Sequence, residues 1–184
     1  LNIEVVKLYC EPNGDFPHNP EPLKKNLTEL SNKVVENKAH LGIAVDPDVD
    51  RLVFICENGE IFGEENTLVA CSDYVLKNNP GPTVSNLSSS LALKDISQKH
   101  NQAHFYSAVG EVNVVKKMKD CNAVIGGEGN GGVIYPKSHY GRDAIVGIGL
   151  FLSLYAELDL KASQLLDTYP KYYMIKEKIN LSEG

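Results

Sequence analysis

The sequence has no apolar run long enough to cross a bilayer. The longest one, Ala144 to Ala156, has 13 residues and includes two glycines and a serine, whereas a membrane-spanning helix needs about 20 apolar residues. We therefore predict a buried helix here and no membrane partner. The first residues, Leu1 to Glu4, also lack a basic leader followed by an apolar stretch, so no secretion signal is predicted.

Basic residues are too few for a nucleic-acid-binding surface. The 184 residues include 18 lysines and arginines against 24 aspartates and glutamates, which gives a formal net charge of −6. Without a basic run, the chain is not expected to have a nucleic-acid partner. The hydrophobic content of 42% is ordinary for a globular chain and excludes wholesale disorder.

Cysteines are few, and none is paired in the sequence. The four cysteines form no C-x-x-C pair, and their spacing fits neither a zinc site nor a dense disulfide framework. We expect reduced thiols and a cytoplasmic location. The chain begins with leucine rather than methionine, and we expect it to be a fragment of a longer protein.

Short apolar segments alternate with amphipathic ones along the chain. We predict strands at 3–9, 41–45, 52–56, 83–86, 104–108, 123–126, 133–135 and 172–179. Helices are predicted from about residue 21, and at 64–77, 91–100, 112–120, 143–158 and 162–166. This alternation predicts an α/β fold with mixed, mostly parallel sheets flanked by helices.

The dipeptide Asn58-Gly59 is a strong hairpin-turn signal that interrupts the alternation. We place a domain boundary there. Residues 1–59 are then the last part of one α/β unit, and residues 60–184 are a nearly complete second unit. The first unit is too small for an independent three-layer domain, so we expect it to be incomplete.

Three carboxylates at alternating positions, Asp46, Asp48 and Asp50, follow the strand predicted at 41–45. Like charges held close together raise one another's pKa, and a divalent cation removes this repulsion. Oxygen ligands suit Mg²⁺ or Ca²⁺, and ligand sites in α/β proteins gather after buried strands. The neighbouring Arg51 offers a fork that matches phosphate oxygens. A solvated acidic turn without a ligand is the alternative.

Two other motifs compete for this acidic segment. An EF-hand needs glycine at the sixth position of its loop, where this chain has Arg51, so that motif is rejected. A haloacid-dehalogenase-like phosphatase has an Asp-x-Asp pattern in which the first aspartate is the nucleophile. Asp46 and Asp48 fit that pattern, but Asp50 replaces the small or hydroxylated residue that should follow.

A glycine-rich loop, Gly126 to Gly132, follows the strand predicted at 123–126. It contains the spacing G-x-G-x-x-G, but a strand rather than a helix is predicted after it, so dinucleotide binding is rejected. Glu128 accepts hydrogen bonds, and Asn130 both donates and accepts them, which suits sugar hydroxyls. A mobile surface loop without a ligand is the alternative.

Taken together, these motifs resemble the α-D-phosphohexomutase family, which includes phosphoglucomutases, phosphomannomutases and phosphoglucosamine mutases. The segment 46–51 resembles the family's metal-binding loop, usually Asp-Gly-Asp-Gly-Asp-Arg. The segment 127–131 resembles its sugar-recognition loop, commonly Gly-Glu-x-Ser-Gly, with asparagine here in place of serine. Val109-Gly110-Glu111 resembles a third segment near the active site, and residues 16–22 resemble a loop of the second domain.

The resemblance implies phosphohexomutase-like three-layer units and an enzyme of four domains. This chain matches the later part of domain 2, with the metal-binding loop, and domain 3, with the sugar-binding loop. The serine loop of the first domain and the phosphate-binding loop of the fourth have no counterpart here. The expected partners are therefore the missing domains of the same parent chain and a hexose phosphate substrate.

The implied reaction is an isomerisation: Mg²⁺-dependent transfer of a phosphoryl group between C1 and C6 of a hexose through a phosphoserine on an absent domain. The isolated chain is expected to be inactive. The resemblance implies Mg²⁺ ligands at Asp46, Asp48 and Asp50, and a catalytic Arg51 that steadies the phosphate. It implies substrate contacts at Gly110, Glu111, Glu128 and Asn130. The alternatives are the metal-dependent phosphatase described above and a non-catalytic sugar-phosphate-binding module.

Overall fold

The structure is a computed structural model that describes residues 3–174. Its elements are η1 (Lys24–Asn26), α1 (Thr28–Glu36), β1 (Leu41–Val45), β2 (Leu52–Cys56), α2 (Glu64–Asn78), β3 (Thr83–Asn86), α3 (Ala92–Lys99), β4 (His104–Ser107), α4 (Glu111–Asp120), β5 (Ile125–Glu128), β6 (Gly132–Ile134), α5 (Ala144–Ala156) and α6 (Ala162–Asp167). Most of the predicted helices and strands are present, with bounds that differ by one or two residues.

The strands form two sheets. β1 and β2 pair as an antiparallel hairpin, and the second sheet has the strand order β4-β3-β5-β6. Within it, β3 runs parallel to β4 and β5, and only β6 is antiparallel. The predicted α/β class, with a mostly parallel sheet flanked by helices, is confirmed.

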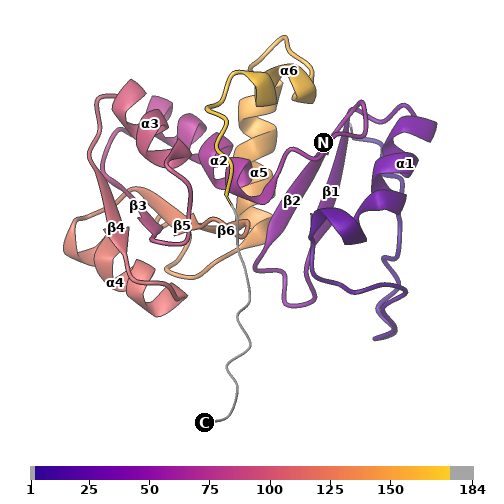
Figure 1. Cartoon of the computed structure of the whole chain (residues 1–184), viewed down its shortest axis with the longest axis horizontal. Helices are drawn as coiled ribbons and strands as arrows, with labels where there is room; N and C mark the ends of the chain where they lie inside the picture. The colour runs from indigo at the N-terminus through magenta and orange to yellow at the C-terminus, as the bar shows by residue number, and fades with distance from the viewer. Residues whose placement is uncertain (1–2, 175–184) are drawn as a thin grey trace.

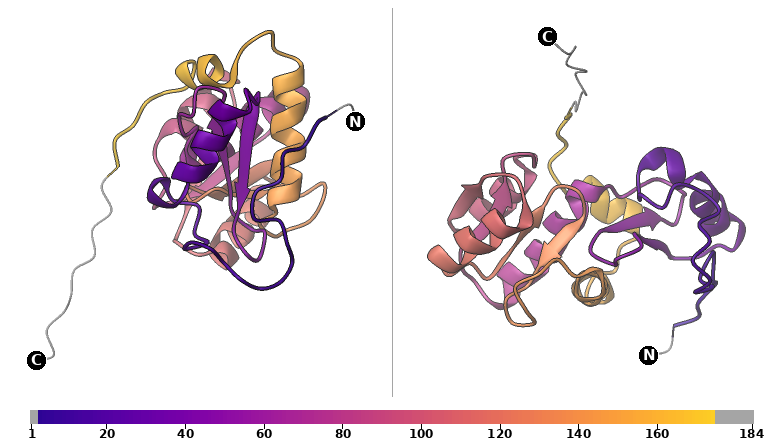
Figure 2. Two further views of the ribbon diagram at one scale, coloured as in Figure 1. Left: turned by 90° about the vertical axis from the view of Figure 1, so that its right-hand side faces the viewer. Right: turned by 90° about the horizontal axis from the view of Figure 1, so that it is seen from below.

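Helices cover both faces of the four-stranded sheet. α4 packs on one face against Val84 and Ile134, while α2 and α3 pack on the other against Ile125 and Val133. α2 and α5 lie between this sheet and the β1–β2 hairpin, which carries α1 on its outer side (Figure 1). The right-hand view of Figure 2 looks along α5, with the hairpin and the sheet on its two sides.

Strand β2 is shared by two hydrophobic cores. All five of its side chains are fully buried. Leu52, Phe54 and Cys56 belong to the large core formed with α2 and α5, whereas Val53 and Ile55 pack against α1 in a smaller core. Successive side chains of a strand point to opposite faces, so a continuous apolar run serves a strand that is covered on both sides.

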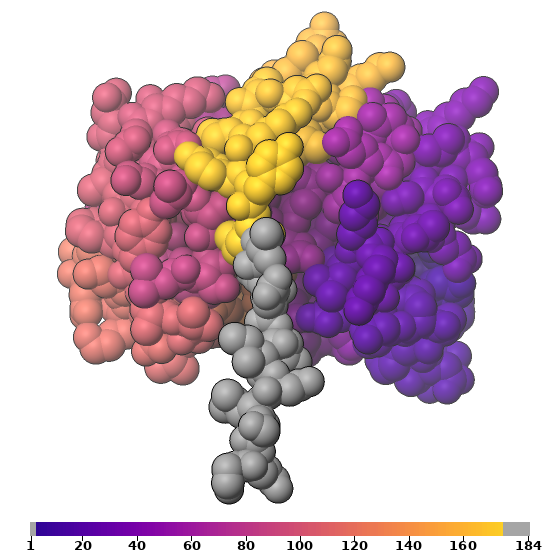
Figure 3. All heavy atoms as spheres, viewed as in Figure 1, coloured from indigo at the N-terminus to yellow at the C-terminus, as the bar shows by residue number. Residues whose placement is uncertain are grey.

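Helix α6 also connects the β1–β2 hairpin with the part of the chain that contains the four-stranded sheet. The carboxylate of Glu57, just after β2, accepts a hydrogen bond from the backbone amide of Ser163 at 3.1 Å. In the space-filling view, α6 and the yellow residues that follow it lie over the boundary between the hairpin side and the sheet side (Figure 3). A polar contact at the helix start thus adds to the apolar contacts of β2.

The strand predicted at 3–9 is wrong. Residues 3–9 contain no strand, and Ile3, Val5 and Val6 are at least half exposed. A strand needs a neighbouring edge to satisfy its backbone groups, and these residues have no such neighbour within the described part of the chain. The strand predicted at 172–179 lies mostly outside the described residues, and 172–174 are not a strand.

The first helix begins later than predicted. A 3-10 turn at Lys24–Asn26 precedes α1, which begins at Thr28 rather than near residue 21. Pro20 and Pro22 explain the delay, because the residue before a proline is disfavoured in the helical region. Leu27 and Val34 are buried, as the helical spacing predicted.

The predicted glycine-rich loop is mostly a hairpin. β5 begins two residues later than predicted and ends at Glu128, and Gly132 already belongs to β6. These glycines permit close strand packing: a Cβ on Gly127 would collide with the carbonyl oxygen of Gly132. Glu128 is therefore held on a strand, which fixes it more firmly than a loop would.

The four cysteines are all free thiols in the structure, as predicted. Burial raises the pKa of Cys71 to about 12, which makes that thiol unreactive. Among the described residues, no helix combines the length and the apolar character that spanning a bilayer requires.

A half-buried histidine lies between hydroxyl groups on the parallel strands. The Nδ1 atom of His104 is 2.8 Å from Thr83 Oγ1, and its Nε2 atom is 3.1 Å from Ser85 Oγ. Burial, with a smaller contribution from Lys94, lowers the pKa of His104 to about 4. The unfolded chain titrates near 6.5, so between these values the unfolded state binds more protons than the folded state.

We expect the folded state to lose stability as the pH falls from about 6.5 to about 4. The contribution of His104 is on the order of 2–3 kcal/mol. Urea unfolding of wild type and His104→Gln at pH 7.0, 5.5 and 4.5 measures it, because glutamine keeps hydrogen-bonding groups but does not titrate. Identical pH slopes in the two proteins would contradict the assignment.

Candidate functional site

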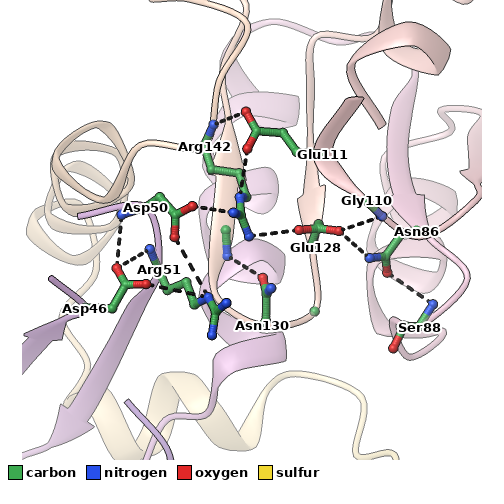
Figure 4. Close-up of polar contacts among 12 residues, drawn as sticks. Asp46, Asp50, Arg51, Asn86, Ser88, Gly110, Glu111, Glu128, Asn130 and Arg142 are labelled. Carbon is green, nitrogen blue, oxygen red and sulfur yellow. Dashed lines mark hydrogen bonds and ion pairs between the residues drawn. The ribbon is translucent and has the colours of Figure 1, made fainter. Parts of the chain in front are cut away.

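Polar groups meet at the carboxyl ends of three parallel strands, where α/β proteins bind ligands. Asn86 ends β3, Gly110 follows β4, and Glu128 ends β5. The β1–β2 hairpin brings a fourth segment to the same place: residues 46–51, which we call the acidic loop. Figure 4 shows these side chains directed toward one another.

The acidic loop is a tight turn organised by its first aspartate. Asp46 is only 7% exposed. Its Oδ1 atom accepts hydrogen bonds from the backbone amides of Asp50 at 3.0 Å and Arg51 at 2.9 Å. One carboxylate oxygen from each of Asp46, Asp48 and Asp50 lies within 4.8 Å of the others. The structure therefore brings the three predicted metal ligands together.

The electrostatics of the loop favour a bound cation. Burial raises the pKa of Asp50 to about 6; Asp46 and Asp48 add to this rise, and Arg142 opposes it. The Oδ1 atom of Asp50 is buried and accepts no hydrogen bond from the residues that the structure describes. Three converging carboxylates with one unsatisfied oxygen are a donor set that fits a hard dication such as Mg²⁺.

The rest of the chain holds the acidic loop in a strained shape. Val49 has φ of 58°, a left-handed conformation that costs a β-branched residue about 1–2 kcal/mol. Its carbonyl oxygen accepts a hydrogen bond from the amide of Ala144 at 3.0 Å, and the amide of Leu52 donates to the carbonyl of Gly131 at 3.2 Å. Surrounding structure thus fixes a conformation that the loop alone would not favour.

Arg51 lines a cavity of about 320 Å³. Its Nη1 atom is 3.2 Å from Glu21, in the loop before η1, and its Nε atom is 3.5 Å from Asp46 Oδ2. The cavity is lined by Glu21, Pro22, Leu23, Arg51, Glu64 and Asn130. Two predicted site residues, Arg51 and Asn130, therefore share one cavity.

Glu128 is buried and held by three donors. Its Oε1 atom accepts hydrogen bonds from Asn86 Nδ2 at 2.7 Å and from the amide of Gly110 at 3.2 Å, and its Oε2 atom accepts from Arg142 Nη1 at 2.9 Å. A carboxylate has about four acceptor positions. One position, on Oε2, accepts no hydrogen bond from the residues that the structure describes.

Glu111 contacts Arg142 with both carboxylate oxygens. Arg142 donates from Nε to Oε2 at 3.1 Å and from its backbone amide to Oε1 at 3.3 Å. Arg142 also forms an ion pair with Asp50. The predicted residues Gly110, Glu111 and Glu128 are therefore joined to the acidic loop in one network. Asn130 instead accepts a hydrogen bond from the amide of Gly132 at 3.2 Å, outside this network.

Three members of this network were not predicted from the sequence as site residues, namely Glu21, Asn86 and Arg142. The sequence offered one signal for Arg142. Of the 18 lysines and arginines, only two are arginines, Arg51 and Arg142. Arginine presents five N–H donors in a rigid planar fork, whereas lysine presents a compact ammonium group, so two arginines among many lysines are candidates for positions that use the fork. Glu21 lies in the segment 16–22 that resembles a family loop but was not proposed as a site residue, and Asn86 gave no signal.

Comparison with known families gives two matches along the chain. The family description "Phosphoglucomutase/phosphomannomutase, alpha/beta/alpha domain II" matches residues 1–59. The description "Phosphoglucomutase/phosphomannomutase, alpha/beta/alpha domain III" matches residues 64–172.

Individual relatives agree with these matches. A phosphoglucomutase/phosphomannomutase of Thermococcus kodakarensis is 37% identical over 97% of this chain and 40% of its own length. A phosphoglucosamine/phosphogalactosamine mutase of Sulfurisphaera tokodaii is 34% identical over 90% of this chain and 37% of its own. The crystal structure of a phosphoglucomutase/phosphomannomutase family protein from Burkholderia thailandensis aligns with a TM-score of 0.83 at 27% identity, over 91% of this chain and 37% of that one. The chain thus spans about 40% of the length of the curated relatives it matches.

Proposed function

Because the chain belongs to the phosphoglucomutase/phosphomannomutase family, we propose that it forms the cation-binding and sugar-binding parts of a hexose phosphate mutase. The relatives described above are mutases, which are isomerases. The observation that carries the proposal is the single polar network joining the acidic loop to Glu128. The complete enzyme would move a phosphoryl group between C1 and C6 of a hexose.

We place the phosphoryl carrier, a phosphoserine, on a domain outside this chain. The short span of the match relative to the relatives' length supports that placement. Residues 1–59 would then be the last part of domain 2 and residues 60–184 domain 3, with β2 packed into both. The expected partners are the missing domains and the hexose phosphate.

Asp46, Asp48 and Asp50 would hold Mg²⁺. When bound there, the ion supplies positive charge that offsets the charge developing on a transferred phosphoryl group. Arg51 would exchange its partner Glu21 for a phosphate oxygen, because the guanidinium fork matches phosphate geometry and its ion pair with Glu21 is partly exposed.

Glu128 and Asn130 would hold the sugar. Glu128 has an acceptor position left on Oε2, and Asn130 can both donate and accept at the cavity wall. This combination accommodates hydroxyls from either orientation of a ring that must present first C1 and then C6. Gly110 and Glu111 would act on the sugar through Glu128 and Arg142, since they form hydrogen bonds with these residues.

We expect the chain to bind Mg²⁺ and Asp48→Ala to weaken this binding by about 10-fold or more, because carboxylate number sets the affinity of oxygen-ligand sites. Isothermal titration of MgCl₂ into each protein measures the dissociation constant. Asp15→Ala, which removes an exposed carboxylate of the loop before η1, is the matched control. Equal heats in wild type and Asp48→Ala would remove the metal assignment.

The isolated chain is expected to show no mutase turnover. Glucose 1-phosphate with Mg²⁺ and a catalytic amount of glucose 1,6-bisphosphate should yield no glucose 6-phosphate in a coupled dehydrogenase assay. Turnover by the wild type that Asp48→Ala abolishes would show that the phosphoryl carrier lies within this chain.

A phosphatase that uses Asp46 as its nucleophile is the competing enzyme class. The burial of Asp46 and the two backbone amides bound to its Oδ1 favour a structural and ligand role over an attacking one. A fluoroberyllate adduct on Asp46, seen by ¹⁹F NMR, would support the phosphatase.

A non-catalytic binding module would instead keep its affinity for glucose 1-phosphate after loss of all three aspartates.

A further inference from the structure

We propose that Arg142 is a positioning residue that fixes the acidic loop and the sugar-binding strand end relative to each other. It would hold one oxygen of Asp50 so that the other is presented to a cation, and hold Glu128 in place for the sugar. The proposal rests on the function proposed above, and it assigns Arg142 a role in cation binding.

The guanidinium group of Arg142 contacts three carboxylates from three different elements. Nη2 pairs with Asp50 of the acidic loop, Nε lies 3.1 Å from Glu111 at the start of α4, and Nη1 lies 2.9 Å from Glu128 at the end of β5. Each partner uses a different nitrogen, and the side chain is 15% exposed. Only an arginine presents three nitrogens in one rigid plane, so the contact set specifies this residue type.

The contact with Asp50 decides which of its oxygens is available. Arg142 binds Oδ2, whereas Oδ1 is buried and accepts no hydrogen bond from residues 3–174. Oδ1 is also the atom nearer to Arg51, at 3.8 Å. A hydrogen-bonded partner that orients a ligating carboxylate typically changes metal affinity by about 10–100-fold. Arg142 occupies the place of such a partner.

The backbone around Arg142 is itself anchored. The backbone of Arg142 forms an isolated antiparallel β-bridge with Ile134 at the end of β6. The amide of Asp143 donates a hydrogen bond to the carbonyl of Val133 at 2.9 Å. The Asp143 carboxylate accepts from the amide of Val146 at 2.9 Å and caps α5. The guanidinium thus projects from a fixed point, as a positioning side chain requires.

Removal of Arg142 should change the Mg²⁺ affinity in opposite directions for a positioning residue and for a simple counter-charge. If Arg142 were only a counter-charge, its removal would make the site more negative and would strengthen Mg²⁺ binding by Coulomb attraction. If Arg142 orients Asp50, its removal weakens Mg²⁺ binding despite the gain in negative charge. Arg142→Lys separates the two effects, because it retains the charge and loses the planar fork.

The test is titration of MgCl₂ into wild type, Arg142→Met, Arg142→Lys and Lys77→Met, each first checked for folding by circular dichroism. Lys77 forms a surface ion pair with Glu157, so Lys77→Met is a control for loss of a cation elsewhere. We expect the dissociation constant to rise about 10-fold in Arg142→Met and at least about 3-fold in Arg142→Lys, and to stay unchanged in the control. Arg142→Lys remains decisive if Arg142→Met does not fold.

Hydrogen exchange provides a second readout. Mg²⁺ is expected to slow amide exchange at residues 126–132 in wild type and not in Arg142→Lys, because the link from the acidic loop to Glu128 is then broken. A dissociation constant for Arg142→Lys equal to or below that of wild type, or protection that persists in it, would overturn the inference and leave the proposed function standing. A wild type that binds no Mg²⁺ would remove both.

Discussion

Replacing Phe151 by alanine is expected to lower the free energy of unfolding by about 3–5 kcal/mol, the range for large aromatic-to-alanine changes in a core. Phe151 of α5 is fully buried where the two parts of the chain meet. Its ring stacks on Phe54 of β2 with a centroid distance of 3.8 Å and meets Phe62 edge-on at 5.1 Å. The substitution removes both contacts and leaves a cavity at the junction.

Urea unfolding followed by circular dichroism measures this loss. Ile145→Ala is the matched control, because Ile145 lies on the same helix and is 65% exposed. That variant should differ from wild type by no more than about 0.5 kcal/mol. A Phe151→Ala loss no larger than that of the control would show that the junction is not a packed core.

Gly131→Ala is expected to cost roughly 2–3 kcal/mol of stability and to weaken Mg²⁺ binding about 10-fold. Gly131 has φ of +91°, and a Cβ there would collide with the carbonyl oxygen of Leu52 and lie 3.0 Å from its amide nitrogen. Relief of that collision would break the hydrogen bond from the Leu52 amide to the Gly131 carbonyl. The acidic loop ends at Arg51, directly before Leu52, and would then move.

Urea unfolding measures the loss of stability, and isothermal titration of MgCl₂ measures the loss of Mg²⁺ binding. The control is Gly149→Ala, where a Cβ meets nothing within 4 Å. Because Gly149 lies within α5, alanine should stabilise the protein by about 0.5–1 kcal/mol and leave Mg²⁺ binding unchanged. Normal Mg²⁺ affinity in Gly131→Ala would show that the contact with Leu52 does not position the acidic loop.

The sequence predicted elements well where local patterns decide them. The apolar run at 52–56 and the alternation from residue 64 to residue 167 predicted the correct elements because their patterns match their burial. The run at 41–45 is also a strand, although Ile43 and Val45 are exposed. The segment 3–9 has the same β-branched character but no neighbouring edge. Strand propensity is expressed only where tertiary pairing is available, and no local pattern reports that.

The candidate site was predictable in part for a similar reason. Its motifs are local: Asp46 to Arg51, and the segment around Glu128, are recognisable without a structure, and they carried the family resemblance that the comparisons confirm. Arg142 is 92 residues beyond Asp50 and follows a loop without a motif. Its role depends on which carboxylates the fold brings to it, and only the assembled chain contains that information.

The strand shared by two cores limits how proteins of this kind can exchange parts during evolution. A recombination event at residue 59 would separate β2 from α5. Leu52, Phe54 and Cys56 of β2 would then have to pack against the surface of an unrelated partner. A crossover before β1 would keep that surface intact but would transfer the acidic loop together with the hairpin. The segment from β1 to α6 is therefore expected to be inherited as one block, even though family boundaries divide it.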